Sequence, residues 1–224
     1  RDDATFFKTT YLDNPFLQPE VIAEIERLKD TDENYWRIYG LGERGISRET
    51  IFQTTTYDEL PEGAKLVAYG LDWGYTNDPT AVVSVHRYDN NLYIDELVYS
   101  GGLTNPDIAA RLRELGISRT DEIIADSAEP KSIDEVHREG FNVKPARKGP
   151  DSVRIGIDAM RRYKLHIRET AVNAQKEFRN YKWKVDKNGR MLNEPVDDWN
   201  HAVDSVRYVC LNKLLLKTGQ YFIQ

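Results

Sequence analysis

The chain has 224 residues, of which 40% are hydrophobic and 30% charged, a composition typical of a globular protein with one large domain or one domain and an appendage. A net charge of −6 argues against a protein that coats nucleic acid with its whole surface, and no run reaches the roughly 18 apolar residues of a membrane span. The single Cys210 excludes an internal disulfide and a zinc cluster built from cysteines. The first residues lack the apolar segment of an export signal and begin without Met, so we expect no export and interpret the chain as an excised fragment.

Acidic charge is concentrated in residues 1–64, which hold 14 acidic and 7 basic side chains, whereas residues 65–224 have a balance of +1. A helix is predicted to begin near Pro19, because apolar residues recur at helical spacing as far as Leu28. The glycines around residue 40 lack the GxxxxGK sequence of a phosphate-binding loop. We interpret residues 1–64 as an approach segment to a domain formed by residues 65–224.

From Lys65 onward the pattern changes to strands and helices. Strands are predicted at 65–72, 80–88, 92–100, 121–126, 141–145 and 164–167, and helices at 105–115, 130–138, 152–162 and 169–181. Residues 182–195 predict a hairpin that turns at Asn188-Gly189, before a last helix at about 197–217. Because strands alternate with helices after the first three strands, we predict an α/β fold. Its mixed sheet has three antiparallel strands followed by parallel strands, with helices on both faces.

Two carboxylates follow buried strands, Asp72 after LVAYGL and Asp126 after EIIA. Ligands of open α/β sheets gather outside the carboxyl ends of the strands, which makes these positions candidates for a functional site. Either carboxylate could equally cap the turn that follows its strand. If both strands lie centrally and point the same way, the chain between them is long enough to return Asp126 beside Asp72.

The last helix adds a third carboxylate. A helical wheel gives an apolar seam for packing on the sheet, formed by Trp199, Val203, Val206, Cys210 and Leu214. Asp204 flanks this seam, and His201 lies about one turn away on the same side. Three carboxylates brought together repel one another unless cations are present, and Mg²⁺ or Mn²⁺ suit such oxygen ligands. Two such ions roughly 4 Å apart can activate a water and hold a phosphodiester for in-line attack.

Three segments resemble a known family when they are taken in this order. They are LDWGYTNDPTA (residues 71–81), ADSAEPKSIDEVHREGFNVKPARKGPDSVRIGIDAM (125–160) and WNHAVDSVRY (199–208). Together they are similar to the nuclease domain of the large terminase subunit of tailed bacteriophages, which has a ribonuclease H-like fold, over about Lys65 to Leu216. Residues 10–45 resemble the stretch that joins the ATPase domain of that family to its nuclease.

The resemblance implies a metal-dependent endonuclease that cuts concatemeric double-stranded viral DNA during genome packaging. The family's aspartates match Asp72, Asp126 and Asp204, which would hold two Mg²⁺ or Mn²⁺ ions. His201 matches a histidine that some members place three residues before the last of these aspartates, where others have a different residue, and it would assist as an outer ligand or a proton carrier. An ATPase domain missing from this sequence, a small terminase subunit and a portal are implied as partners. The expected location is the cytoplasm of the infected bacterial host, with no membrane involved.

Basic side chains suggest where double-stranded DNA would bind. Residues 144–168 hold eight basic and two acidic side chains, and sequence-tolerant duplex binding relies on contacts from lysine and arginine to phosphates. We predict DNA contacts from this segment and from the hairpin, at Arg147, Lys148, Arg154, Arg161, Arg162, Lys182 and Lys184. A solvated helix face and an ordinary solubilised hairpin account for the same charges.

Two other hypotheses remain open. The same fold would serve a junction resolvase, a transposase-like enzyme or a nuclease of RNA:DNA hybrids, and cleavage of a four-way junction or a hybrid would distinguish these. Alternatively, the chain is mainly a docking module of a packaging motor, in which the acidic residues 1–64 bind a portal or capsid protein. Portal binding without metal-dependent cleavage would favour this reading.

Overall fold

The computed structural model of the chain describes residues 7–32, 35–43, 50–74, 78–188 and 190–215. These residues form two compact units, one before and one after the boundary between Arg48 and Glu49. No helix among the described ranges is long and apolar enough to cross a membrane.

The first unit contains a helix and two short helical turns. They are η1 (Tyr11–Asp13), α1 (Pro19–Thr31) and η2 (Trp36–Gly40). Helix α1 begins at Pro19 as predicted, because the fixed φ of proline suits the first turn of a helix. Among the described residues of this unit only Gly40 is buried, so its apolar side chains lie largely at the surface.

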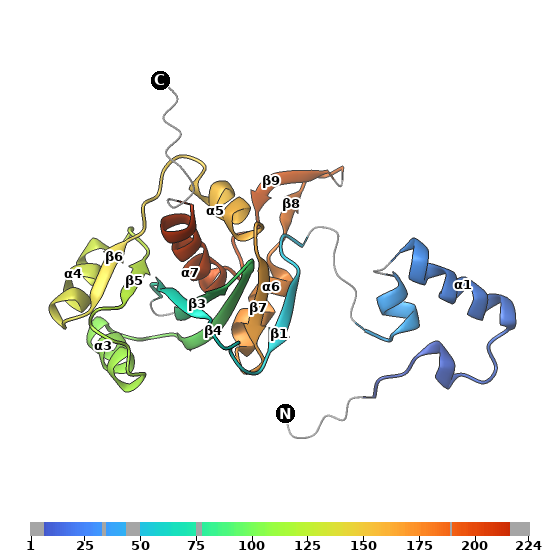
Figure 1. The fold of residues 1–224 in the computed structure, drawn as a ribbon. Coiled ribbons are helices and arrows are strands. Elements are labelled where there is room, and N and C mark those ends of the chain that lie inside the picture. Colours follow the sequence, from blue (N-terminus) through green and yellow to red (C-terminus); the bar gives the residue numbers. More distant parts are fainter. Residues whose placement is uncertain (1–6, 33–34, 44–49, 75–77, 189, 216–224) are drawn as a thin grey trace. The chain divides into compact units, whose positions relative to one another are not determined.

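The second unit is built around a seven-stranded mixed sheet with the order β1-β7-β4-β3-β2-β5-β6 (Figure 1). Its strands are β1 (Thr54–Tyr57), β2 (Lys65–Asp72), β3 (Thr80–Tyr88), β4 (Asn91–Ser100), β5 (Glu122–Ala125), β6 (Asn142–Pro145) and β7 (Lys164–Arg168). Strands β2, β3 and β4 are antiparallel neighbours, and all other pairs in this sheet are parallel. The predicted α/β class with an antiparallel meander and parallel additions is therefore confirmed.

Helices cover both faces of the sheet (Figure 1). On one side lie α3 (Asn105–Glu114) and α4 (Pro130–Arg138), whose apolar residues share a core with β2, β5 and β6. On the other side a larger core contains α5 (Ser152–Met160), α6 (Val172–Asn180) and α7 (His201–Val209), which continues into the π-helical turn η3 (Cys210–Leu214). The hairpin of β8 (Trp183–Val185) and β9 (Met191–Pro195) stands apart from the main sheet.

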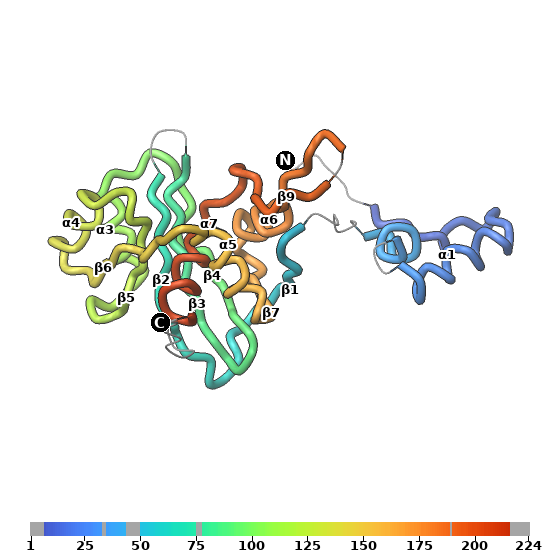
Figure 2. The backbone as a smooth tube through the Cα atoms, turned by 90° about the horizontal axis from the view of Figure 1, so that it is seen from above, coloured from blue at the N-terminus to red at the C-terminus, as the bar shows by residue number. Residues whose placement is uncertain are grey.

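Helix α7 packs most closely on β2 and β3, beside which it lies in Figure 2. A side chain at Gly70 would not fit there, because a Cβ atom would lie 2.1 Å from the carbonyl oxygen of Ser205. The hydroxyl of Ser205 donates to the carbonyl of Ala81 at 3.1 Å and joins the helix to β3 as well. The missing side chain at Gly70 therefore sets how near α7 comes to the strand that ends at Asp72.

The predicted seam of the last helix is wrong at Trp199. The helix begins at His201, and Trp199 precedes it with a φ of 59° and 44% exposure, its ring covered by the ammonium of Lys176 at 4.1 Å. The first turn is fixed by buried Glu177, which accepts backbone N–H groups from the start of the helix. The later seam positions Val203, Val206, Cys210 and Leu214 are buried.

Strand β1 lies before Lys65, although the sequence pattern predicts that the domain begins at Lys65. Strand β1 pairs in parallel with β7, more than a hundred residues later, and Ile51 and Phe52 just before it belong to the larger core. The four residues TTTY of β1 show no apolar pattern of their own. They form the edge strand of the sheet, and their order depends on pairing with the distant strand β7.

Candidate active site

Asp72 ends the central strand β2 with its carboxylate largely enclosed, the side chain being 13% exposed. Its Oδ2 lies 3.0 Å from Nδ1 of His201, in the first turn of α7. Burial raises the pKa of Asp72 above its ordinary range, and the charge of Asp204 adds to this, while the bond to His201 works against it. The same bond raises the pKa of His201. A buried carboxylate is thus paired with an imidazole that is inclined to carry charge.

Asp126 follows the neighbouring parallel strand β5 and lies beside Asp72. Its backbone N–H donates to the carbonyl of Leu71 at 3.0 Å, and its own carbonyl accepts from the indole Nε1 of Trp73 at 3.0 Å. These bonds extend the β2–β5 ladder by one residue past the last pair, Leu71 and Ala125. Two aspartates from segments far apart in the sequence therefore meet at the carboxyl ends of adjacent strands.

Tyr208 joins the two carboxylates. Its hydroxyl lies 3.1 Å from Oδ1 of Asp72 and 3.1 Å from Oδ2 of Asp126, so both carboxylates face a common point. Burial first and the nearby aspartates second raise the pKa of Tyr208, which keeps the phenol protonated. A single hydroxyl proton serves one acceptor at a time, so this group relieves only part of the repulsion between the two charges.

Lys148 supplies a positive charge beside the carboxylate of Asp126. Its ammonium contacts Oδ1 of Asp126 directly and lies 4.8 Å above the ring centroid of Tyr208. Burial would raise the pKa of Asp126, but the bonds from Lys148, the N–H of Ala128 and Tyr208 outweigh it and hold this pKa below its ordinary value. The pKa of Asp126 is therefore lowered, whereas the pKa of its neighbour Asp72 is raised.

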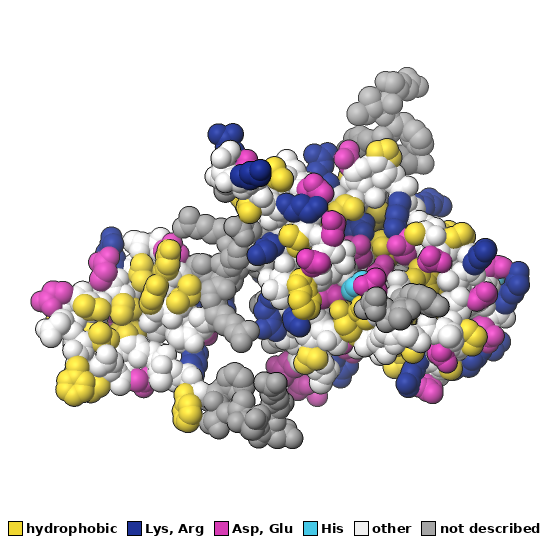
Figure 3. Space-filling view, turned by 180° about the vertical axis from the view of Figure 1, so that it is seen from behind, with side chains coloured by type: hydrophobic (Ala, Val, Ile, Leu, Met, Phe, Trp, Pro, Cys, Tyr) yellow, Lys and Arg dark blue, Asp and Glu magenta, His cyan; other side chains and the backbone are white. Residues whose placement is uncertain are grey.

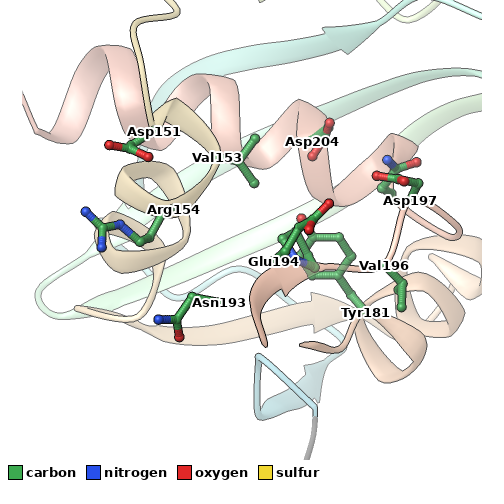
Figure 4. A pocket seen from close by; sticks show the side chains of 11 residues that line it. Asp151, Val153, Arg154, Tyr181, Asn193, Glu194, Val196, Asp197 and Asp204 are labelled. Atoms are coloured by element: carbon green, nitrogen blue, oxygen red, sulfur yellow. The ribbon is translucent and has the colours of Figure 1, made fainter. Parts of the chain in front are cut away.

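Asp204 lies one turn after His201 on α7, and its carboxylate is held by Arg207 in a two-pronged ion pair with distances of 3.0 and 2.8 Å. It lines a groove of about 510 Å³ between the start of α5, strand β9 and α7. Figure 4 shows the carboxylates of Asp151, Glu194 and Asp197 around this groove, with Arg154 on the side of α5. The charge of Asp204 acts on Asp72, yet its oxygens are committed to Arg207.

Glu177 fixes the N-terminus of α7 and thereby the position of His201. Its side chain is fully buried, and its two oxygens accept the N–H groups of His201, Ala202 and Val203 at 3.2, 2.6 and 3.2 Å. The hydroxyl of Tyr99 donates to the same carboxylate at 2.8 Å. A carboxylate on the free N–H groups of a helix satisfies donors that would otherwise be buried without partners.

The predicted DNA-binding residues fall into separate places. Arg147 and Lys148 follow β6 at the end of the sheet where Asp72 lies, and Arg154 is exposed at the start of α5. Arg161 and Arg162 precede the first residue of β7, which pairs with the first residue of β4 and so lies at the opposite end. Lys182 and Lys184 belong to the hairpin region, where the ammonium of Lys184 pairs with Glu194 and Asp197.

The two strand-end carboxylates fit a hard divalent cation. They offer oxygen ligands that face one point, and two donors of positive character, Lys148 and His201, occupy them. In the described part of the chain no group of three or more His, Cys, Asp or Glu side chains is close enough to hold a metal ion. The meeting of all three aspartates on shared ions thus stays a prediction.

Sequence reasoning missed Tyr208, Glu177 and Arg207. Tyr208 had a signal, because it follows His201 by seven residues and Asp204 by four, which places all three on one side of a helix. Glu177 had none, since a glutamate in a polar helix resembles a solvated residue until the fold buries it. Lys148 was assigned to DNA, and its contact with Asp126 depends on the parallel pairing of β5 with β6.

Figure 3 shows a face of the molecule on which acidic side chains gather around a histidine. Ligands of open α/β sheets bind outside the carboxyl ends of the strands, which is where Asp72 and Asp126 lie.

Comparisons with known proteins place the chain among phage proteins. A family model described as a terminase RNase H-like domain matches residues 72–211, and one described as the phage terminase large subunit matches residues 1–43. The terminase large subunit of Bacillus phage SPP1 is 37% identical over 216 residues, covering 89% of this chain and 50% of that protein. The PBSX phage terminase large subunit of Bacillus subtilis is 27% identical over 219 residues, covering 93% and 50%. The chain spans about half the length of these relatives.

Solved structures of large terminase nucleases are also similar to this chain. The nuclease domain of the large terminase g2p from bacteriophage SPP1, with bound Mn, has a TM-score of 0.63 and 29% identity, covering 72% of this chain and 97% of that one. The large terminase nuclease of the thermophilic phage G20c, with bound magnesium, has a TM-score of 0.54 and 16% identity, covering 74% and 98%. The second likeness concerns the fold alone.

Proposed function

The chain belongs to the phage terminase large subunits and carries their RNase H-like domain, and from this premise we propose that it is a divalent-metal-dependent endonuclease. Its substrate would be concatemeric double-stranded viral DNA, cut when packaging begins and ends. The observation that carries the proposal is the convergence of Asp72 and Asp126 on one point at the ends of adjacent strands. The Mn-bound SPP1 nuclease domain supports the choice of metal.

Asp72 and Asp126 would hold the metal, with Asp204 joining them as the third carboxylate when it leaves Arg207. One or two Mg²⁺ or Mn²⁺ ions bound there would activate a water and stabilise the leaving oxygen of a phosphodiester. Burial raises the pKa of Asp72, because it removes the charged carboxylate from water. A divalent ion bound to Asp72 would stabilise that charge, so the buried position favours metal binding.

His201 would orient Asp72 and move a proton. Its Nδ1 is committed to Asp72, and its Nε2 lies 4.0 Å from the exposed Asp78, towards the outside of the site. An imidazole anchored through one nitrogen can pass a proton through the other, which would serve the oxygen that leaves the cleaved phosphate. Glu177 would keep this ring in place by holding the backbone of the first helical turn.

Duplex DNA would lie across the end of the sheet that carries Asp72. Arg147 and Arg154 are exposed there and could contact phosphates on either side of the cleaved bond. Arg161 and Arg162 lie at the opposite end and would contact only DNA that extends far beyond the site. In the whole protein, an ATPase domain, the small subunit and the portal would act together with this domain in the host cytoplasm.

The decisive experiment is cleavage of supercoiled plasmid by the isolated chain with Mn²⁺. We expect nicked and linear products from the wild type and a loss of at least about a hundredfold in rate for Asp72→Asn and Asp126→Asn, because each removes a charged metal ligand. Asp134→Asn is the matched control, since Asp134 is an exposed residue of α4 that pairs with Arg138 on the same helix. Undiminished cleavage by either strand-end variant would falsify the proposed site.

A further inference from the structure

Lys148 occupies one of the two carboxylate oxygens that Asp126 offers to a divalent ion. Its ammonium contacts Oδ1, which also accepts the N–H of Ala128 at 2.8 Å, while Oδ2 accepts the hydroxyl of Tyr208. Every acceptor oxygen of this carboxylate therefore has a donor from the chain itself. A carboxylate oxygen accepts about two hydrogen bonds, so Oδ1 is fully occupied by Lys148 and the N–H of Ala128, and a cation that binds Oδ1 must displace one of these two donors.

The position of Lys148 is built into the fold. The neighbouring residue Arg147 donates its backbone N–H to Oδ1 of Asn212 at 2.8 Å, and Asn212 in turn donates to the carbonyl of Tyr208 at 2.8 Å. On the other side, the N–H of Ala146 donates to the carbonyl of Ala125 at 2.7 Å. The segment that carries Lys148 is thus tied both to the strand before Asp126 and to the helix that bears Tyr208.

The ammonium can nevertheless leave without disturbing the core. The side chain of Lys148 is 31% exposed, and the next residue, Gly149, has open space around the position of a side chain. By contrast, Tyr208 is 1% exposed and is packed into the helix contact. Of the two side chains that bind Asp126, Lys148 is the one that can give way.

We propose that Lys148 is an internal counter-ion of Asp126 that a divalent cation replaces. In the metal-free protein the ammonium neutralises Asp126 next to a second carboxylate, which keeps the site assembled. When a divalent ion binds, the ammonium is released at the rim of the site, where the nearest anion of a DNA complex is a phosphate. This inference rests on the proposed function, since it takes Asp126 as a metal ligand.

The test is direct measurement of Mn²⁺ binding without DNA, by the electron paramagnetic resonance signal of free Mn²⁺. The ion pair of Lys148 with Asp126 is partly exposed and competes with the metal. Its loss in Lys148→Met should therefore tighten Mn²⁺ binding about fivefold relative to the wild type. Lys148→Arg keeps the charge and should bind Mn²⁺ nearly as weakly as the wild type. Lys144→Met is the matched control, because the Lys144 ammonium pairs with Glu122 at the far end of β5 and should not affect Mn²⁺ binding.

If Lys148→Met binds Mn²⁺ as tightly as the wild type or more weakly, the proposed replacement of Lys148 by the cation is wrong. Thermal unfolding of each variant without metal shows whether it is folded, and Lys148→Arg provides the comparison if the methionine variant is not. Asp126→Asn separates this outcome from failure of the proposed function. If the asparagine variant binds Mn²⁺ as the wild type does, the metal assignment itself fails, whereas if only Lys148→Met is unchanged, the metal site stands without the exchange.

Discussion

At the scale of single residues, Glu177 combines complete burial with four hydrogen bonds, three of them from the start of α7. Burial raises the pKa of Glu177 above its ordinary value of 4.5, and the donors offset only part of this effect. A carboxyl group whose pKa is higher in the folded state binds more protons there than in the unfolded state. Its contribution to stability is therefore complete below the unfolded pKa and is lost as pH rises through the folded pKa.

We expect this pH dependence to disappear in Glu177→Gln. The free energy of unfolding of the wild type, relative to that of the variant, should fall as pH rises from the ordinary glutamate pKa of 4.5 through the higher pKa of folded Glu177, because only the wild type ionises a carboxyl group at this position. Urea denaturation at several pH values measures this difference. Glu114→Gln, at an exposed residue of α3, serves as the control and should show no comparable trend. A constant difference across the range would contradict the assignment of Glu177 as the titrating group.

At the scale of elements, the contact of α7 with β2 decides whether His201 and Tyr208 reach Asp72. The absence of a side chain at Gly70 allows this contact, since a Cβ atom there would meet the backbone of Ser205. Gly70→Ala should lower the free energy of unfolding by about 1–3 kcal/mol through overpacking, measured by urea denaturation. The same shift should reduce plasmid cleavage, because two partners of Asp72 lie on the displaced helix.

Gly149→Ala is the control for that substitution. Within the part of the chain that the structure describes, no atom lies within 4 Å of a Cβ atom at Gly149, so its effect on stability should stay within about 0.5 kcal/mol. Equal stability of the Gly70 and Gly149 variants would show that the helix can move away from the strand at little cost.

The elements also show what the sequence could predict. The meander of β2, β3 and β4 contains apolar runs of strand length and a short turn between β3 and β4, so local pattern suffices for it. Strand ends such as Asp72 and Asp126 follow from the same patterns. By contrast, β1 and the start of α7 depend on distant partners, namely β7 and Glu177, which no local pattern reveals. The contact of Lys148 with Asp126 was missed for the same reason, whereas Arg207 and Asp204 lie three residues apart on one helix, where a helical wheel indicates such a pair.

At the scale of the whole molecule, the boundary between the two units predicts where the chain can be cut. A chain of residues 49–224 should unfold at the same urea concentration as the second unit of the full chain, because it keeps β1 and its core residues. A chain of residues 65–224 lacks Phe52, which is 4% exposed and stacks on Tyr181. It should lose at least about 3 kcal/mol, the usual cost of removing a buried aromatic side chain. If both chains are equally stable, β1 is not part of the folding unit.

The edge position of β1 has a mechanical consequence. Any pull on the chain from before Glu49 reaches the sheet first through its edge strand β1, whose backbone ladder is with β7. Three strands, β7, β4 and β3, separate β1 from β2 and so from Asp72. We therefore expect tension on the chain to detach the edge strand before it distorts the region around Asp72, so that β1 protects the candidate site from mechanical load.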